Sequence, residues 1–91
     1  FTFNLDINFL NNPNFSPEGN LEKIARWFES IYAGYPFDAS MAAALTKSYK
    51  IMDQQERSIH YKNRFNEILK ESGYWQNRVK EFPEILEMAE A

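Results

Sequence analysis

The sequence of 91 residues contains no cysteine and only one histidine, His60. Without cysteine, neither a disulfide nor a thiolate metal site can form within the chain. Its three glycines are scattered, so no glycine-rich phosphate loop is present. No serine or acid is arranged around His60 as a nucleophile and orienting group would be. We therefore expect no enzyme, and no catalytic, cofactor-binding or metal-binding residues.

Long apolar runs are also missing, so we expect no membrane partner. The absence of cysteine fits a reducing compartment, and we expect an intracellular, cytoplasmic protein. Charge is divided along the chain: residues 47–80 hold eight Lys or Arg against four Asp or Glu, whereas residues 81–91 hold four Glu and no base. The formal net charge of −3 argues against general nucleic-acid binding, which depends on cationic contacts to phosphate.

Hydrophobic residues make up 44% of the chain and aromatic residues 16%. This is enough apolar material for one small domain spanning residues 1–91. The aromatic content exceeds what a small helical core needs, so part of it should face a partner. We select Trp27 and Trp75 as candidate partner-binding residues on α-helical segments.

Residues 1–9 alternate strictly between apolar and polar side chains, which is typical of a half-buried strand. No second stretch of this kind follows, so residues 1–10 should form an extended, strand-like arm. A lone strand has unpaired backbone groups that can bind another chain. The candidate partner-binding residues of this arm are Phe1, Phe3, Leu5, Ile7 and Phe9.

The rest of the sequence predicts a mainly α-helical bundle of three to four helices, over residues 17–33, 39–52, 53–72 and 75–90. Residues 21–32 carry apolar side chains at helical spacing. Gly34 is typical of a left-handed residue that ends a helix, and Asp38 is a candidate N-cap for the next one. Pro83 predicts a break or kink in the last segment.

Residues 41–72 contain neither glycine nor proline, which leaves one continuous helix as an alternative to two. Asp53 and Glu56 have the spacing of a capping box, in which each side chain bonds the backbone amide of the other. This pattern favours a new helix that starts at Asp53. Gly73 then predicts the end of that helix.

Residues 48–53, followed by Arg57 and Tyr61, resemble the last part of the J-domain found in chaperone partners. That family acts through a His-Pro-Asp loop, and the corresponding segment here, residues 35–38, reads Tyr-Pro-Phe-Asp and lacks the histidine. The resemblance implies a degenerate J-like module that binds without stimulating a chaperone's ATPase.

A second set of residues follows along the chain in the order Trp27-Phe28, Tyr35-Pro36, Leu45 and Lys62-Asn63-Arg64. In this order the set resembles the three-helix homeodomain. In that family an asparagine reads adenine in the major groove and neighbouring arginines hold phosphate. The present chain has Glu67 and Glu71 where the family carries a basic tail. If the homeodomain alternative holds, the protein is nuclear, and Lys62, Asn63 and Arg64 contact nucleic acid.

The function that these observations favour is a non-catalytic protein–protein interaction module: an adaptor, an assembly subunit or a small inhibitor. Its partner is another protein or a second copy of the chain. A degenerate homeodomain-like DNA-binding domain and a degenerate J-like module remain the alternatives.

Overall fold

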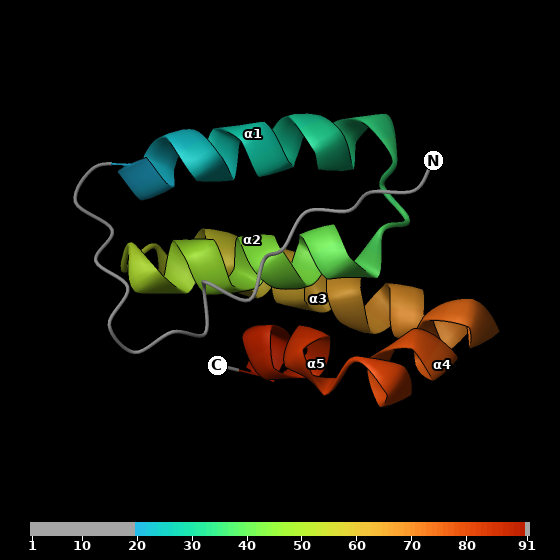
Figure 1. Ribbon diagram of the computed structural model, residues 1–91. Coiled ribbons are helices and arrows are strands. Elements are labelled where there is room, and N and C mark those ends of the chain that lie inside the picture. Colours follow the sequence, from blue (N-terminus) through green and yellow to red (C-terminus); the bar gives the residue numbers. More distant parts are fainter. Residues whose placement is uncertain (1–19, 91) are drawn as a thin grey trace.

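The computed structural model describes residues 20–90 and confirms a mainly α-helical bundle (Figure 1). Helices account for 87% of the described residues. The predicted arm lies outside the described residues. The five helices of the described part are α1 (Asn20–Gly34), α2 (Ala39–Ile51), α3 (Gln55–Glu71), α4 (Gly73–Glu81) and α5 (Pro83–Glu90).

Helix α2 is the centre of the bundle, and α1, α3 and α5 all pack against it (Figure 1). Burial extends around most of this helix rather than along one stripe. Ala42, Ala43 and Ala44 expose none of their surface, and Leu45 is equally enclosed. Small side chains allow the neighbouring backbones to approach closely, and a helix that is apolar on most sides belongs inside a domain.

Helix α1 covers α2 with the apolar stripe that its spacing predicts. Leu21, Ala25, Phe28 and Tyr32 are buried along this stripe. From the other sides α3 contributes Phe65 and Ile68, and α5 contributes Ile85, Met88 and Ala89. One continuous core therefore joins four of the helices. Helix α4 has no buried residue of its own, although Trp75 and Val79 are partly buried against the core.

The turn between α1 and α2 is short and built by local hydrogen bonds. Gly34 is the last residue of α1 and does not adopt the left-handed conformation, so that part of the prediction is wrong. Instead, the amide of Tyr35 bonds back to the carbonyls of Ile31 and Tyr32, at 3.1 Å each. Pro36 then makes continuation of the helix at Tyr35 unfavourable.

Asp38 caps the start of α2, as expected. Its Oδ1 accepts hydrogen bonds from the amides of Ser40 (3.0 Å) and Met41 (3.2 Å). These bonds satisfy two of the backbone donors that a helix start leaves without partners. The cap thereby fixes the direction in which the chain enters α2.

The run from 41 to 72 is two helices, but the reason for the break differs from the predicted capping box. Asp53 has a φ of 60° and is the left-handed residue that terminates α2, while Gln54 precedes α3 and makes no side-chain cap. The amide of Asp53 bonds to the carbonyl of Lys50 (3.0 Å), and the amide of Gln54 bonds to that of Tyr49 (2.8 Å). This pair of bonds is a Schellman motif, in which glycine normally occupies the left-handed position.

We expect Asp53→Gly to raise the free energy of unfolding by about 0.5–1 kcal/mol. Glycine removes the steric cost of the left-handed conformation and the negative charge at a helix C-terminus, although it makes the unfolded chain more flexible. Urea denaturation followed by circular dichroism measures the change. Asp53→Ala is the matched control, because it removes the charge but keeps a β-carbon, and it should gain less than glycine. Equal or lower stability of the glycine variant would contradict this account.

The predicted segment 75–90 consists of two helices joined at Phe82. Pro83 is the first residue of α5, where its missing amide has no cost, and Phe82 lies outside the helical region at φ −126°, ψ 76°. Gly73 does not end α3 in a left-handed conformation but begins α4. Ser72 makes this corner, since its Oγ accepts a hydrogen bond from the amide of Trp75 (3.2 Å).

Candidate functional site

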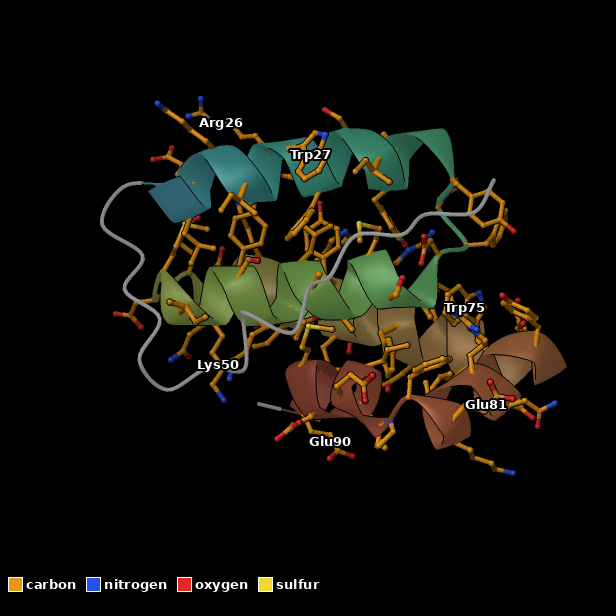
Figure 2. All side chains as sticks on the ribbon, in the orientation of Figure 1. Arg26, Trp27, Lys50, Trp75, Glu81 and Glu90 are labelled. Carbon is orange, nitrogen blue, oxygen red and sulfur yellow. The ribbon has the colours of Figure 1, made fainter. Side chains whose placement is uncertain are left out.

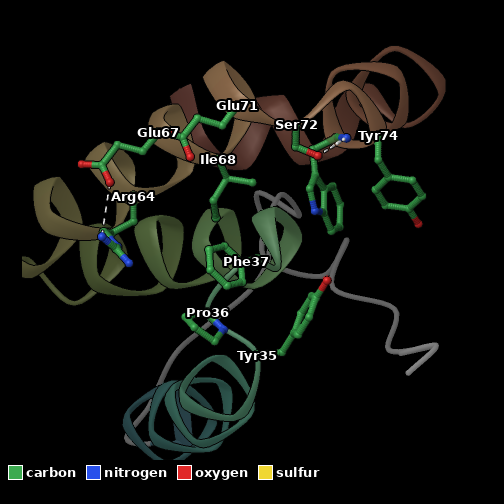
Figure 3. A pocket seen from close by; sticks show the side chains of 10 residues that line it. Tyr35, Pro36, Phe37, Arg64, Glu67, Ile68, Glu71, Ser72 and Tyr74 are labelled. Carbon is green, nitrogen blue, oxygen red and sulfur yellow. Dashed lines mark hydrogen bonds and ion pairs between the residues drawn. The ribbon is translucent and has the colours of Figure 1, made fainter.

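A pocket of about 500 Å³ lies where the α1–α2 turn meets the end of α3 and the start of α4 (Figure 3). Tyr35 enters from the turn and Tyr74 enters from α4, so residues almost forty positions apart line the same hollow. The turn hydrogen bonds and the Ser72 cap hold these two segments in place. The lining residues are Tyr35, Pro36, Phe37, Arg64, Glu67, Ile68, Glu71, Ser72, Tyr74 and Trp75.

Four of the ten residues that line this pocket are aromatic, and three of these rings are largely open to solvent. Tyr35 is 54% exposed, Phe37 62% and Tyr74 63%. Tyr35 packs edge-to-face on Phe37 with ring centroids 6.2 Å apart, and Tyr74 does the same with Trp75 at 5.2 Å. Such pairs hold each other in defined orientations. Gathered exposed aromatic surface of this kind is typical of a binding site rather than of an ordinary solvated face.

Among the described residues, one carboxylate of the pocket has no counter-ion. Arg64 pairs with Glu67 at 3.2 Å, and its Nε also donates to the hydroxyl of Tyr32 at 3.4 Å. This contact with Tyr32 raises the pKa of Arg64. Glu71 makes no hydrogen bond or ion pair with another described residue. The lining therefore carries a net charge of −1, located on Glu71.

Next to the pocket, Arg78 of α4 lies over two aromatic rings. Its guanidinium carbon is 4.6 Å from the centroid of Phe82 and 5.8 Å from that of Tyr74. The Nε of Arg78 is buried and has no hydrogen-bond partner among residues 20–90. Within the described part of the chain, this guanidinium is therefore stabilised by aromatic faces and not by a carboxylate.

A second polar cluster joins α1, α2 and α3 around Glu29. Its carboxylate accepts hydrogen bonds from the hydroxyls of Tyr49 and Tyr61, the latter at 2.9 Å. The two rings stack almost parallel, with centroids 5.8 Å apart, and Arg57 lies over Tyr49 at 5.4 Å. The three polar groups satisfy one another, so this cluster holds the helices together rather than offering an open site.

Burial raises the pKa of both phenols in this cluster. For Tyr49, the hydrogen bond to Glu29 adds to the effect of burial, while the Arg57 guanidinium acts in the opposite direction. For Tyr61, burial and the hydrogen bond to Glu29 also raise the pKa. Ionisation would place a second negative charge beside Glu29, so the neutral phenols are favoured.

Of the predicted partner-binding residues, the structure describes only Trp27 and Trp75. Phe1, Phe3, Leu5, Ile7 and Phe9 lie outside the described residues. Trp27 is on α1, 49% exposed and stacked on Phe28, whereas Trp75 lines the pocket (Figure 2). The structure does not bring the two tryptophans together in this site. Sequence reasoning missed Tyr35, Phe37 and Tyr74; the available signal was an aromatic residue on each side of Pro36 and a pair directly after Gly73.

The residues of the nucleic-acid alternative all lie on α3. Lys62 and Asn63 are exposed, while Arg64 is half-buried and engaged with Tyr32 and Glu67. The DNA-binding alternative stays a prediction. His60 is exposed, and its ring contacts that of Tyr61 edge-to-face at 5.0 Å.

Comparison with known proteins gives no assignment: no family model matches the chain, and neither do the curated proteins or the solved structures. Within residues 20–90, no helix combines the length and the apolar character needed to cross a bilayer. The same part of the chain holds no group of three acidic or histidine side chains placed to bind a metal ion.

Proposed function

We propose that this chain is a non-catalytic protein-binding module that docks a short segment of a partner protein in the aromatic pocket. The observation that supports this proposal is the gathering of Tyr35, Phe37 and Tyr74, each more than half exposed, around one hollow. Aromatic side chains are enriched where proteins bind one another, because they bury a large area with few rotatable bonds. The volume of the hollow, about 500 Å³, lies within the range of pockets that bind ligands.

The three exposed rings of the pocket, Tyr35, Phe37 and Tyr74, are not explained by the needs of the fold. The core is built from other side chains, chiefly those of α2 and the stripe of α1, and α4 contributes no buried residue. Tyr35 and Phe37 occupy the exposed side of a turn that Asp38 and backbone bonds already stabilise. A docking role gives these rings a purpose that packing does not.

The proposal is tested by panning a library of displayed random 12-residue peptides against the immobilised full chain. We expect enriched peptides whose affinity falls about tenfold or more when Tyr35 is replaced by alanine. Trp27→Ala is the matched control, because it removes an exposed aromatic outside the pocket and should leave these peptides bound. Circular dichroism verifies that both variants keep their helices.

Two results would overturn the proposal. The first is a selection that yields no peptide able to distinguish the wild type from Tyr35→Ala, or one whose peptides depend on Trp27 instead. The second is self-association of the wild type, measured by sedimentation equilibrium, that Tyr35→Ala abolishes. In that case the occupant of the pocket is a second copy of the chain.

A further inference from the structure

We infer that the pocket recognises a cationic side chain, specifically the guanidinium group of an arginine in a segment of the partner. This inference rests on the proposed docking function and specifies its ligand. It combines three features of the site: aromatic faces, a carboxylate with no partner within residues 20–90, and the way in which the chain already holds its own arginines.

The aromatic faces are the first feature. The face of a Tyr, Phe or Trp ring carries partial negative charge and attracts a cation within about 6 Å of its centroid. Four such rings line one hollow, at Tyr35, Phe37, Tyr74 and Trp75. They enter from two separate segments (Figure 3), so a side chain inserted between them meets rings from more than one direction.

The second feature is the charge that remains in the pocket. Arg64 and Glu67 neutralise each other, and Arg64 is further held by the Tyr32 hydroxyl. Glu71 keeps its negative charge without a partner among the described residues. A carboxylate is an acceptor for the forked donors of a guanidinium. An acidic ligand would instead meet the charge of Glu71 and an arginine that is already paired.

The third feature is internal to the chain. Both of the described cations that lie over rings are arginine guanidinium groups: Arg57 lies over Tyr49, and Arg78 lies over both Tyr74 and Phe82. Tyr74, which lines the pocket, thus already contacts a guanidinium along one side. Because a guanidinium is planar and weakly hydrated, it stacks on rings more readily than an ammonium does. A ligand arginine would repeat this contact within the pocket.

The test uses four synthetic peptides, Ac-Gly-Gly-X-Gly-Gly-amide, in which X is arginine, lysine, citrulline or norleucine. Binding to the full chain is followed by two-dimensional NMR at the amides of Tyr35, Glu71 and Tyr74. It is also followed by fluorescence of the Trp27→Phe variant, in which Trp75 is the sole tryptophan because the chain has two. We expect the arginine peptide to bind about five- to tenfold more tightly than the citrulline peptide, which keeps the shape but loses the charge.

A variant that removes the charge of Glu71 separates the role of this carboxylate from that of the aromatic rings. Glu71→Gln should weaken the arginine peptide about threefold to tenfold and leave the citrulline peptide unchanged. Glu56→Gln, on the exposed first turn of the same helix and outside the pocket, should change neither affinity. Increasing salt should weaken the arginine peptide more than the citrulline peptide.

The outcomes separate this inference from the function on which it rests. Equal binding of the arginine and citrulline peptides, with no effect of Glu71→Gln, would overturn the cationic ligand while signals at Tyr35 and Tyr74 still report a docking pocket. A library selection dominated by neutral, proline-rich peptides would also overturn the cationic ligand and leave the docking function in place. If neither the four peptides nor the library produces any change at the pocket residues, the docking function is wrong as well.

Discussion

Replacement of Phe28 by alanine is expected to lower the free energy of unfolding by about 3–5 kcal/mol. Phe28 is completely buried and lies in the middle of the α1 stripe that covers α2. Its loss leaves a cavity that the surrounding helices fill only in part. Small domains have a total stability of roughly 5–15 kcal/mol, so the variant should lose a large share of its stability.

Urea denaturation followed at 222 nm measures this loss. Lys23→Ala is the control, because Lys23 is exposed on the same helix and its replacement should change the stability by no more than about 0.5 kcal/mol. A loss below about 1 kcal/mol in the Phe28 variant would mean that the contact between α1 and α2 contributes little to the fold.

Alkaline pH is expected to destabilise the protein through Tyr49 and Tyr61. Their pKa values are raised in the folded protein, so above the ordinary phenol pKa of about 10 the unfolded chain releases these protons first. Stability from this source is complete below pH 10 and is lost as the pH rises toward the folded pKa values. The free energy of unfolding should fall by up to about 1.4 kcal/mol per pH unit for each tyrosine.

Denaturation at several pH values from about 9 to about 12 measures this slope. The double variant Tyr49→Phe/Tyr61→Phe has no phenol in the Glu29 cluster and should show a shallower decline. Because other groups titrate in both proteins, the difference between the two slopes isolates the cluster. Identical slopes would show that neither burial nor the hydrogen bonds to Glu29 favour the neutral phenols.

Much of the helical fold could be predicted because its signals are local. The stripe of α1 and the cap at Asp38 depend on residues within a few positions of one another, as does the break at Pro83. The corner at Asp53 was predicted in place but with the wrong cause. A left-handed aspartate and an Asp-x-x-Glu capping box look alike in sequence, and only the backbone conformation separates them.

The central position of α2 could not be predicted from its pattern. Apolar periodicity identifies a helix that has one buried face. In α2 the consecutive residues Ala42, Ala43 and Ala44 are all buried, so burial is not confined to one face. The pocket escaped prediction for another reason. Tyr35 and Tyr74 line the same pocket only because α2 and α3, which lie between them in the sequence, run in opposite directions. No local sequence signal encodes this arrangement. The same holds for Glu29 and its two tyrosines.

The absence of buried residues in α4 has a consequence for how the pocket responds to a ligand. Segments with few buried contacts open at a lower free energy than the rest of a domain. Tyr74 and Trp75 belong to α4, which among the described helices should therefore be displaced at the lowest free energy. Tyr35 and Phe37, in contrast, lie next to the hydrogen-bonded cap of α2. Tyr74 and Trp75 should therefore shift to fit a bound side chain, while Tyr35, Phe37 and the core around α2 keep their positions.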